Sequence, residues 1–145
     1  MVSPFPTRIV FRQTALELLR HEAEAAYPRE ACGVLIGLRE ITSLQVELTV
    51  AGANLSADPL AFELDPACLV EAEREAAARG LAILGFWHSH ADAPAILSEK
   101  DRLGAWPHAL QVVVPVSGAG MGLPRFYRGL DADWSEVLEF EIAAG

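Results

Sequence analysis

The chain has 145 residues, a length that suits one domain, and 52% of them are hydrophobic, enough for a sizeable core. We therefore expect residues 1–145 to form a single domain. With 20 acidic residues against 11 basic ones, the formal net charge is −9. Such a surface repels phosphate backbones and argues against nucleic acid as a partner. No apolar run approaches the roughly 20 residues of a membrane span, which argues against a membrane partner.

The N-terminus and the cysteine content favour the cytoplasm. Residues 1–6 have neither a basic start nor an apolar stretch, so they do not resemble a secretory signal. Cys32 and Cys68 are the only cysteines, which argues against a disulfide framework and for a reducing compartment. We therefore expect a cytoplasmic protein.

The first predicted elements are a short strand over residues 8–11 and a helix after it. Thr14 and Glu17 have the spacing of a capping box at the start of a helix. Apolar residues then recur at helical spacing, at Ala15, Leu16, Leu19, Ala23 and Ala26. Pro28 disfavours helical backbone in the residue before it, so the helix is expected to stop there.

A hairpin and a second helix come next. Two strand-like runs, 31–38 and 41–51, are separated by two residues only, which favours a β-hairpin although the usual turn residues are missing. After a loop over 52–59, Asp65 is the expected N-cap of a second helix, with proline in its first position. Gly80 supplies the C-terminal stop of that helix.

The C-terminal half predicts further strands and one short helix. The apolar run 81–87 has strand character and leads into His88, and Ser98 can cap a short helix. The remaining predicted strands are 109–116, 125–127 and 137–142. The sum is a mixed α/β domain, in which a sheet is flanked by about two long helices and a short helix follows the His-x-His segment.

His88 and His90 form a His-x-His pair where the predicted strand ends. Residues two apart in a strand point to the same side, so both imidazoles can face one metal ion. A carboxylate would complete a three-ligand zinc site and leave a fourth position for water, as in catalytic zinc sites. Asp101, at the start of the short helix, and Asp92, nearer in sequence, are the two candidates. We favour Asp101, because Asp92 lies on a loop that departs from the strand.

Glu30 is a candidate for the base that a metal-bound water requires. It leads into the strand 31–38, where a carboxylate can be held within reach of such a water. The residues alone do not distinguish it from the other glutamates of the chain.

These residues together resemble the pattern of the JAMM (MPN+) metalloprotease family. That pattern is a distant Glu, then His-Ser/Thr-His, seven residues, Ser, two residues and Asp. Here Glu30, His88-Ser89-His90, Ser98 and Asp101 fill it. The likeness covers nearly the whole chain, and the length of the chain is similar to that of members of the family's minimal prokaryotic branch. It also includes Glu30-Ala31-Cys32-Gly33, Asn54, Pro59, Phe62, Pro66, Gly85-Phe86-Trp87, Gln111-Val112-Val113-Val114 and Arg125-Phe126-Tyr127.

The resemblance implies a single MPN-like (cytidine-deaminase-like) domain and a role for each motif residue. His88, His90 and Asp101 would hold one zinc ion per chain. Glu30 would be the general base, hydrogen-bonded to the zinc water. Ser98 would donate a hydrogen bond to the oxyanion of the reaction, and its competing role is the helix N-cap.

Two positions depart from the family pattern. The family usually has proline after the second histidine and again before the serine, and these positions are Ala91 and Leu97 here. Because proline stiffens a chain, the loop between the ligands is expected to be looser. Near the motif, Cys32 is expected to pack against the site, and Trp87 and Trp106 are expected in the core.

The resemblance also implies a reaction. It is the hydrolysis, by a zinc-dependent metallopeptidase or isopeptidase, of the amide bond at the C-terminal Gly-Gly of a ubiquitin-like sulfur-carrier protein, fused or conjugated. One alternative is a zinc amidohydrolase that acts on small peptides or cysteine-type adducts. Another is a non-catalytic MPN interaction module, which would be expected to lack a ligand or Glu30.

Overall fold

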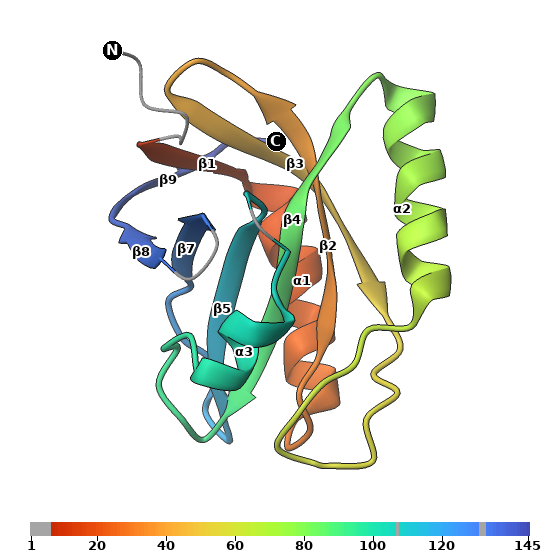
Figure 1. The fold of residues 1–145 in the computed structure, drawn as a ribbon, viewed down its shortest axis with the longest axis vertical. Coiled ribbons are helices and arrows are strands. Elements are labelled where there is room, and N and C mark those ends of the chain that lie inside the picture. Colours follow the sequence, from red (N-terminus) through yellow and green to blue (C-terminus); the bar gives the residue numbers. More distant parts are fainter. Residues whose placement is uncertain (1–6, 107, 131–132) are drawn as a thin grey trace.

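The computed structural model describes residues 7–106, 108–130 and 133–145. Within these residues three helices flank one mixed sheet (Figure 1): α1 (Gln13–Ala26), α2 (Pro66–Arg79) and α3 (Glu99–Gly104). The strands are β1 (Arg8–Arg12), β2 (Cys32–Arg39), β3 (Ser43–Gly52), β4 (Ala82–Ala91), β5 (Leu110–Ser117), β6 (Gly120–Met121), β7 (Arg125–Leu130), β8 (Asp133–Val137) and β9 (Glu139–Ala143). None of the described helices is long and apolar enough to cross a bilayer.

The strand order places β4 in the interior of the sheet. The order is β8-β7-β5-β4-β2-β3-β1-β9, and the short β6 pairs with the end of β5. β4 is antiparallel to β2 on one side and parallel to β5 on the other. Two long helices, one short helix and a mixed sheet confirm the predicted fold class.

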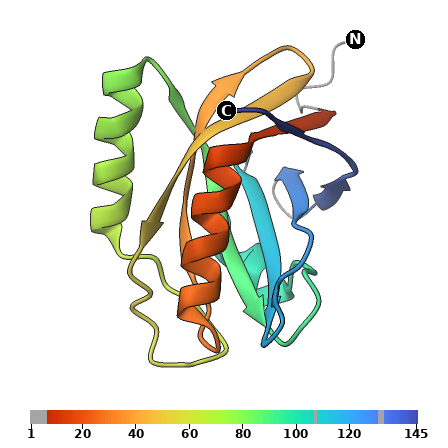
Figure 2. The same ribbon diagram turned by 180° about the vertical axis from the view of Figure 1, so that it is seen from behind.

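The two long helices cover opposite faces of the sheet, as Figures 1 and 2 show from the two sides. Successive residues of a strand point to opposite faces. In β2, Leu35 therefore joins the larger core with α1, whereas Val34 and Ile36 join a smaller core with α2. Cys32, two residues before Val34, shares the α2 face, and so does His88, its partner on β4. The histidine site thus lies on the face away from α1.

The predicted capping box at the first helix is wrong. β1 leads directly into α1, whose N-cap is Arg12 and has no side-chain capping bond. Thr14 lies inside the helix, and its hydroxyl donates to the carbonyl of Gly145 at 2.8 Å. The residue that binds Thr14 therefore comes from the other end of the chain, which the local spacing of Thr14 and Glu17 does not reveal.

Two strand predictions also need correction. The hairpin of β2 and β3 is confirmed, but residues 40–42 connect the two strands. The predicted strand 137–142 is two strands at opposite edges of the sheet, because β8 pairs with β7 and β9 pairs in parallel with β1. Leu138, at the break between them, is 82% exposed, so the apolar run is not one buried strand.

Candidate metal centre and active-site cleft

The end of β4 holds His88 and His90 toward the same point. The strand continues through both residues, and pairing with β2 and β5 fixes its backbone on either side. The two Nε2 atoms lie 3.2 Å apart. Ser89, between them, is buried, and its Oγ accepts a hydrogen bond from the backbone N–H of Ala31 at 2.8 Å.

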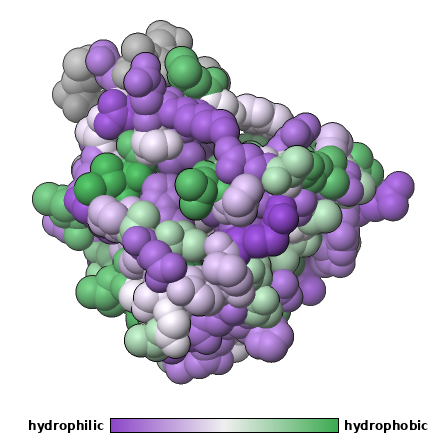
Figure 3. Space-filling view, turned by 90° about the horizontal axis from the view of Figure 1, so that it is seen from below, coloured by the Kyte–Doolittle hydropathy of each residue, from purple (hydrophilic) through white to green (hydrophobic). Residues whose placement is uncertain are grey.

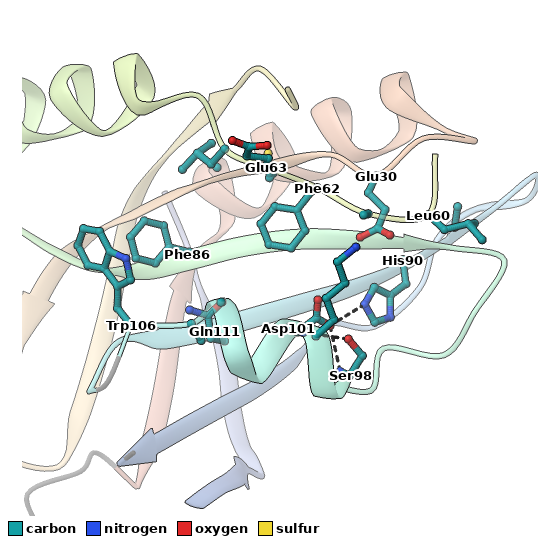
Figure 4. Close-up of a pocket in the computed structure, with 18 of the residues that line it drawn as sticks. Glu30, Leu60, Phe62, Glu63, Phe86, His90, Ser98, Asp101, Trp106 and Gln111 are labelled. Atoms are coloured by element: carbon teal, nitrogen blue, oxygen red, sulfur yellow. Dashed lines mark hydrogen bonds and ion pairs between the residues drawn. The ribbon is translucent and has the colours of Figure 1, made fainter. Parts of the chain in front are cut away.

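The first turn of α3 brings Asp101 to the two histidines. Its Oδ2 lies 3.2 Å from each Nε2. Ser98 caps the helix, since its Oγ accepts from the N–H of Asp101 at 3.1 Å, and its own N–H donates to Asp101 Oδ2 at 3.0 Å. This reciprocal capping box aims the aspartate back at the strand end (Figure 4).

The other carboxylate considered from the sequence, Asp92, has a different partner. The chain turns there with φ of 54°, and both carboxylate oxygens of Asp92 accept from the hydroxyl of Tyr27, at 2.9 and 2.8 Å. Of the two aspartates, the structure brings Asp101 to the histidine pair.

The spacing of the three side chains fits one zinc ion. A tetrahedral zinc with bonds of 2.0–2.1 Å places its ligand atoms about 3.3 Å apart. The three atoms here are mutually 3.2 Å apart. The other ring nitrogen of His90 lies 2.9 Å from the carbonyl of Pro94, which accepts its proton and leaves the Nε2 lone pair directed at the site.

The surroundings favour the metal-binding charge state of His88 and of Asp101, whereas at His90 burial is outweighed by hydrogen bonds, that with Asp101 foremost, so that its pKa is raised. Burial lowers the pKa of His88, which favours the neutral imidazole. Burial opposes ionisation of Asp101, but hydrogen bonds with His88 and His90 and the backbone N–H of Ser98 hold its pKa well below the usual range. A neutral histidine and an ionised carboxylate are the states in which these side chains bind a metal.

Glu30 stands beside this group, directly before β2. One of its carboxylate oxygens and the ring nitrogens of His88 and His90 lie within 4.8 Å of one another. The residue is 7% exposed, and burial raises its pKa to about 7, with the charge of Asp101 adding to the effect and that of His90 opposing it. A carboxyl group with a pKa near neutrality is suited to accept and return a proton.

A cleft of about 790 Å³ opens on the site. Glu30, His90, Ser98 and Asp101 line one part, and Phe86 and Trp106 lie at the far end (Figure 4). On the surface of this end of the molecule, hydrophilic and hydrophobic side chains are interspersed (Figure 3).

Two of the three packing predictions near the motif are confirmed. Trp87 is buried, and Cys32 is packed beside the site, where burial raises its pKa to about 12 and keeps it a thiol. The prediction for Trp106 is wrong, because this ring is 53% exposed and meets Phe86 edge-on at the end of the cleft. A single exposed ring between a short helix and a strand has no periodic pattern that would reveal it.

The loop after β4 is anchored despite its missing prolines. Ala95 and Leu97 are buried against Val113 and Tyr127. The hydroxyl of Tyr127 donates to the carbonyl of Ala95 at 2.7 Å. Packing and one buried hydrogen bond therefore tie down the segment that leads from His90 to Ser98.

A comparison with family models agrees with this geometry. The model described as prokaryotic homologs of the JAB domain, Prok-JAB, matches residues 12–128. The chain belongs to this family. The JAMM resemblance expected from the sequence is thereby confirmed, and the match spans the segment from the start of α1 to β7, with all the site residues inside it.

Curated relatives of the Prok-JAB chain are enzymes by name. A protein of Haloferax volcanii named desampylase is 31% identical over 109 residues, which cover 74% of this chain and 77% of that protein. A protein of Thermus thermophilus named probable TtuB-protein conjugate cleaving protease is 33% identical over 95 residues, or 65% of this chain and 57% of that protein. The chain is accordingly a hydrolase of the JAMM type.

A solved structure shows the same fold. The solution structure of a protein from Desulfitobacterium hafniense has a TM-score of 0.83 and 25% sequence identity, and the alignment covers 94% of each chain. The sheet and helices that position the Prok-JAB site here are therefore an arrangement found in another solved protein.

Proposed function

We propose that the chain is a zinc-dependent peptidase or isopeptidase that cleaves after the C-terminal Gly-Gly of a ubiquitin-like sulfur-carrier protein, in the cytoplasm. The observation that carries the proposal is the set of three ligand atoms, mutually 3.2 Å apart, at one end of a cleft that also contains Glu30 and Ser98. The names of the Haloferax and Thermus relatives support a ubiquitin-like conjugate as the substrate.

Each site residue has a task in amide hydrolysis. His88, His90 and Asp101 hold the zinc ion, which when bound supplies Lewis-acid activation of water and of the scissile carbonyl. Glu30 takes a proton from the attacking water and returns it to the departing amine, a transfer that its pKa of about 7 favours. The Ser98 hydroxyl donates a hydrogen bond to the oxyanion that develops on the carbonyl oxygen.

The cleft suits an extended tail that ends in glycine. Phe62 projects into it beside the site and stacks on His88, with ring centroids 4.4 Å apart (Figure 4). A Gly-Gly segment carries no side chain that would collide with this ring. Residues further up the tail would reach the apolar end of the cleft at Phe86 and Trp106.

The test presents the zinc-loaded protein with fusions of a small ubiquitin-like carrier ending in Gly-Gly, and maps the products by mass spectrometry. The wild type is expected to cut after the second glycine, and chelation is expected to stop the reaction. Glu30→Gln should lower kcat by about 10²–10⁴, the range typical of a lost general base. Glu63→Gln, which changes another glutamate of the cleft lining, is the matched control.

Two results would contradict the proposal. If Glu30→Gln cleaves as fast as Glu63→Gln, the assignment of the base is wrong. If the wild type binds zinc yet leaves every Gly-Gly fusion intact while cleaving short peptides or small amides, the substrate is not a carrier protein.

A further inference from the structure

The loop over residues 53–65, hereafter the cleft loop, is organised by the side chain of Asn54. The amide nitrogen Nδ2 donates to the carbonyl of Ala61 at 3.0 Å, and Oδ1 accepts from the N–H groups of Ser56 at 3.0 Å and Glu63 at 2.9 Å. Ala61 and Glu63 are the two neighbours of Phe62. Asn54 thus fixes the peptide groups on both sides of the residue that projects into the cleft.

The same side chain also holds the backbone of Glu30. Nδ2 of Asn54 donates a second hydrogen bond, of 2.9 Å, to the carbonyl oxygen of Glu30. The N–H of Ala31 belongs to the same peptide group as that carbonyl, and it donates to the hydroxyl of Ser89 at 2.8 Å. The peptide group that follows Glu30 is therefore held on one edge by the cleft loop and on the other by the strand that carries the histidines.

Phe62 in turn supports a metal ligand. A metal-binding histidine commonly donates its second ring nitrogen to an acceptor that fixes the ring. Nδ1 of His88 has no hydrogen-bond partner among the residues that the structure describes. Its ring is instead stacked on Phe62, with an interplanar angle of 23°.

We propose that Asn54 is a positioning residue, whose four hydrogen bonds set both the base Glu30 and, through Phe62, the ligand His88. Three of these bonds lie within the cleft loop, and the fourth joins the loop to the backbone carbonyl of Glu30. None of the four is a bond to the substrate. The role at Glu30 rests on the proposed function, whereas the role at His88 concerns metal binding alone. Loss of the amide should therefore affect turnover and zinc affinity together.

The decisive variants are Asn54→Asp and Asn54→Ala. Aspartate keeps an oxygen for the N–H groups of Ser56 and Glu63 but sets a carboxylate oxygen against the carbonyls that Nδ2 binds. Alanine removes all four bonds without adding charge. The matched control is Ser56→Ala, because the Ser56 hydroxyl bonds only to Asp58 within the loop.

Zinc affinity is measured by competition with a chromophoric chelator, and kcat and KM are measured on the Gly-Gly fusion. For both Asn54 variants we expect zinc affinity to fall about 10-fold and kcat about 10–100-fold, the range seen when the partner of a ligand is lost. KM is expected to change less than kcat. Ser56→Ala should match the wild type in all three.

A double-mutant cycle tests the route through Phe62. Phe62→Ala should weaken zinc binding as Asn54→Ala does, and the double variant should be no weaker than Phe62→Ala alone, because residues that act through one contact are not additive. Fully additive losses would overturn this route.

The remaining outcomes are also decisive. Zinc affinity and kcat equal to those of Ser56→Ala would overturn the proposal. So would failure of both Asn54 variants to fold by circular dichroism, since Asn54 would then serve the fold as a whole. If the wild type binds zinc but cleaves no fusion, the proposed function fails, and the zinc measurements still decide the role of Asn54 at His88.

Discussion

A single hydroxyl at Ser98 can both cap a helix and serve the reaction. A serine hydroxyl has one proton to donate and two lone pairs to accept with. The cap uses an acceptor, since the N–H of Asp101 donates to Ser98 Oγ. The O–H group stays available for the oxyanion, so the two roles that compete in the sequence are compatible in the structure.

Replacement of Ser98 separates these roles. Ser98→Ala is expected to keep zinc and to lower kcat by about 10²–10³, the effect of losing one oxyanion donor. It also removes the cap, at a cost of about 1 kcal/mol in the free energy of unfolding. Ser98→Thr, which retains the hydroxyl, should recover most of the activity. Turnover, zinc content and urea denaturation check this prediction. Loss of zinc in Ser98→Ala would mean that Ser98 serves only as a helix cap.

The two aspartates provide a matched test of the ligand set. Asp101→Ala removes an oxygen that lies 3.2 Å from both Nε2 atoms. It should weaken zinc binding by more than about 100-fold, beyond the usual loss for residues that only support a ligand. Asp92→Ala loses its bond to Tyr27 and should bind zinc as the wild type does. Equal zinc affinities of the two variants, measured by chelator competition, would refute the assignment.

The sequence predicts part of this site at the residue scale. The spacing of His88 and His90 on a strand indicates a metal pair, but the choice of Asp101 over Asp92 needs the fold. Glu30 is distinguished from the other glutamates of the chain only by the family resemblance or by its burial beside the histidines. Asn54 contacts the backbone of Glu30 before β2, and Phe62 contacts His88 of β4; both contacts come from a distant loop, and no local pattern encodes them.

At the scale of elements, the parallel pairing of β4 and β5 decides where the histidines lie. Gly85 of β4 lies against the backbone of β5, and a Cβ there would come within 1.9 Å of the carbonyl oxygen of Leu110. Backbone cannot move aside as a flexible side chain can. The strand pair can therefore form with this register only if residue 85 has no side chain.

Gly85→Ala should therefore disturb the strand that carries the two proposed histidine ligands. We expect a loss of at least about 1–3 kcal/mol in the free energy of unfolding, the usual cost of overpacking, and weaker zinc binding. The control is Gly118→Ala in the turn between β5 and β6, where a Cβ meets no atom within 4 Å. Its change should stay within about 0.5 kcal/mol. Urea denaturation of both variants checks this, and equal stabilities would contradict it.

Element prediction from sequence succeeds where periodicity is strong and fails where a distant partner decides. Apolar spacing predicts α1, and the Asp65 cap and Gly80 stop of α2 are confirmed. The start of α1 is wrong because Thr14 binds Gly145 from the far end of the chain. The run 137–142 is divided because its two parts pair with opposite edges of the sheet, a property of the topology.

At the scale of the whole molecule, the sheet separates the proposed metal site from most of the core. The larger core lies between the sheet and α1 and includes Ile9, Phe11, Leu19 and Leu35. The histidines face the other side, with the smaller core under α2. Small structural zinc domains lack such a core and unfold without their metal. This chain should instead fold first and bind its metal afterwards.

Chelation should consequently lower the stability of the protein without unfolding it. With free zinc about 100-fold above its Kd, binding to the folded state adds about 2.7 kcal/mol to the free energy of unfolding. At roughly 2–4 °C per kcal/mol for a chain of this size, Tm should drop by about 5–11 °C when zinc is removed. Circular dichroism should show the same helix and strand content before and after chelation.

Asp101→Ala supplies the control, because its Tm should already be that of the chelated wild type and should not respond to chelator. Loss of secondary structure on chelation would show that the α1 core does not suffice to fold the chain. An unchanged Tm in the wild type, with zinc binding measured separately, would mean that the ion binds the unfolded chain as well as it binds this site. Since His88 is buried and held between β2 and β5, the site is preformed in the folded chain, and we expect the shift.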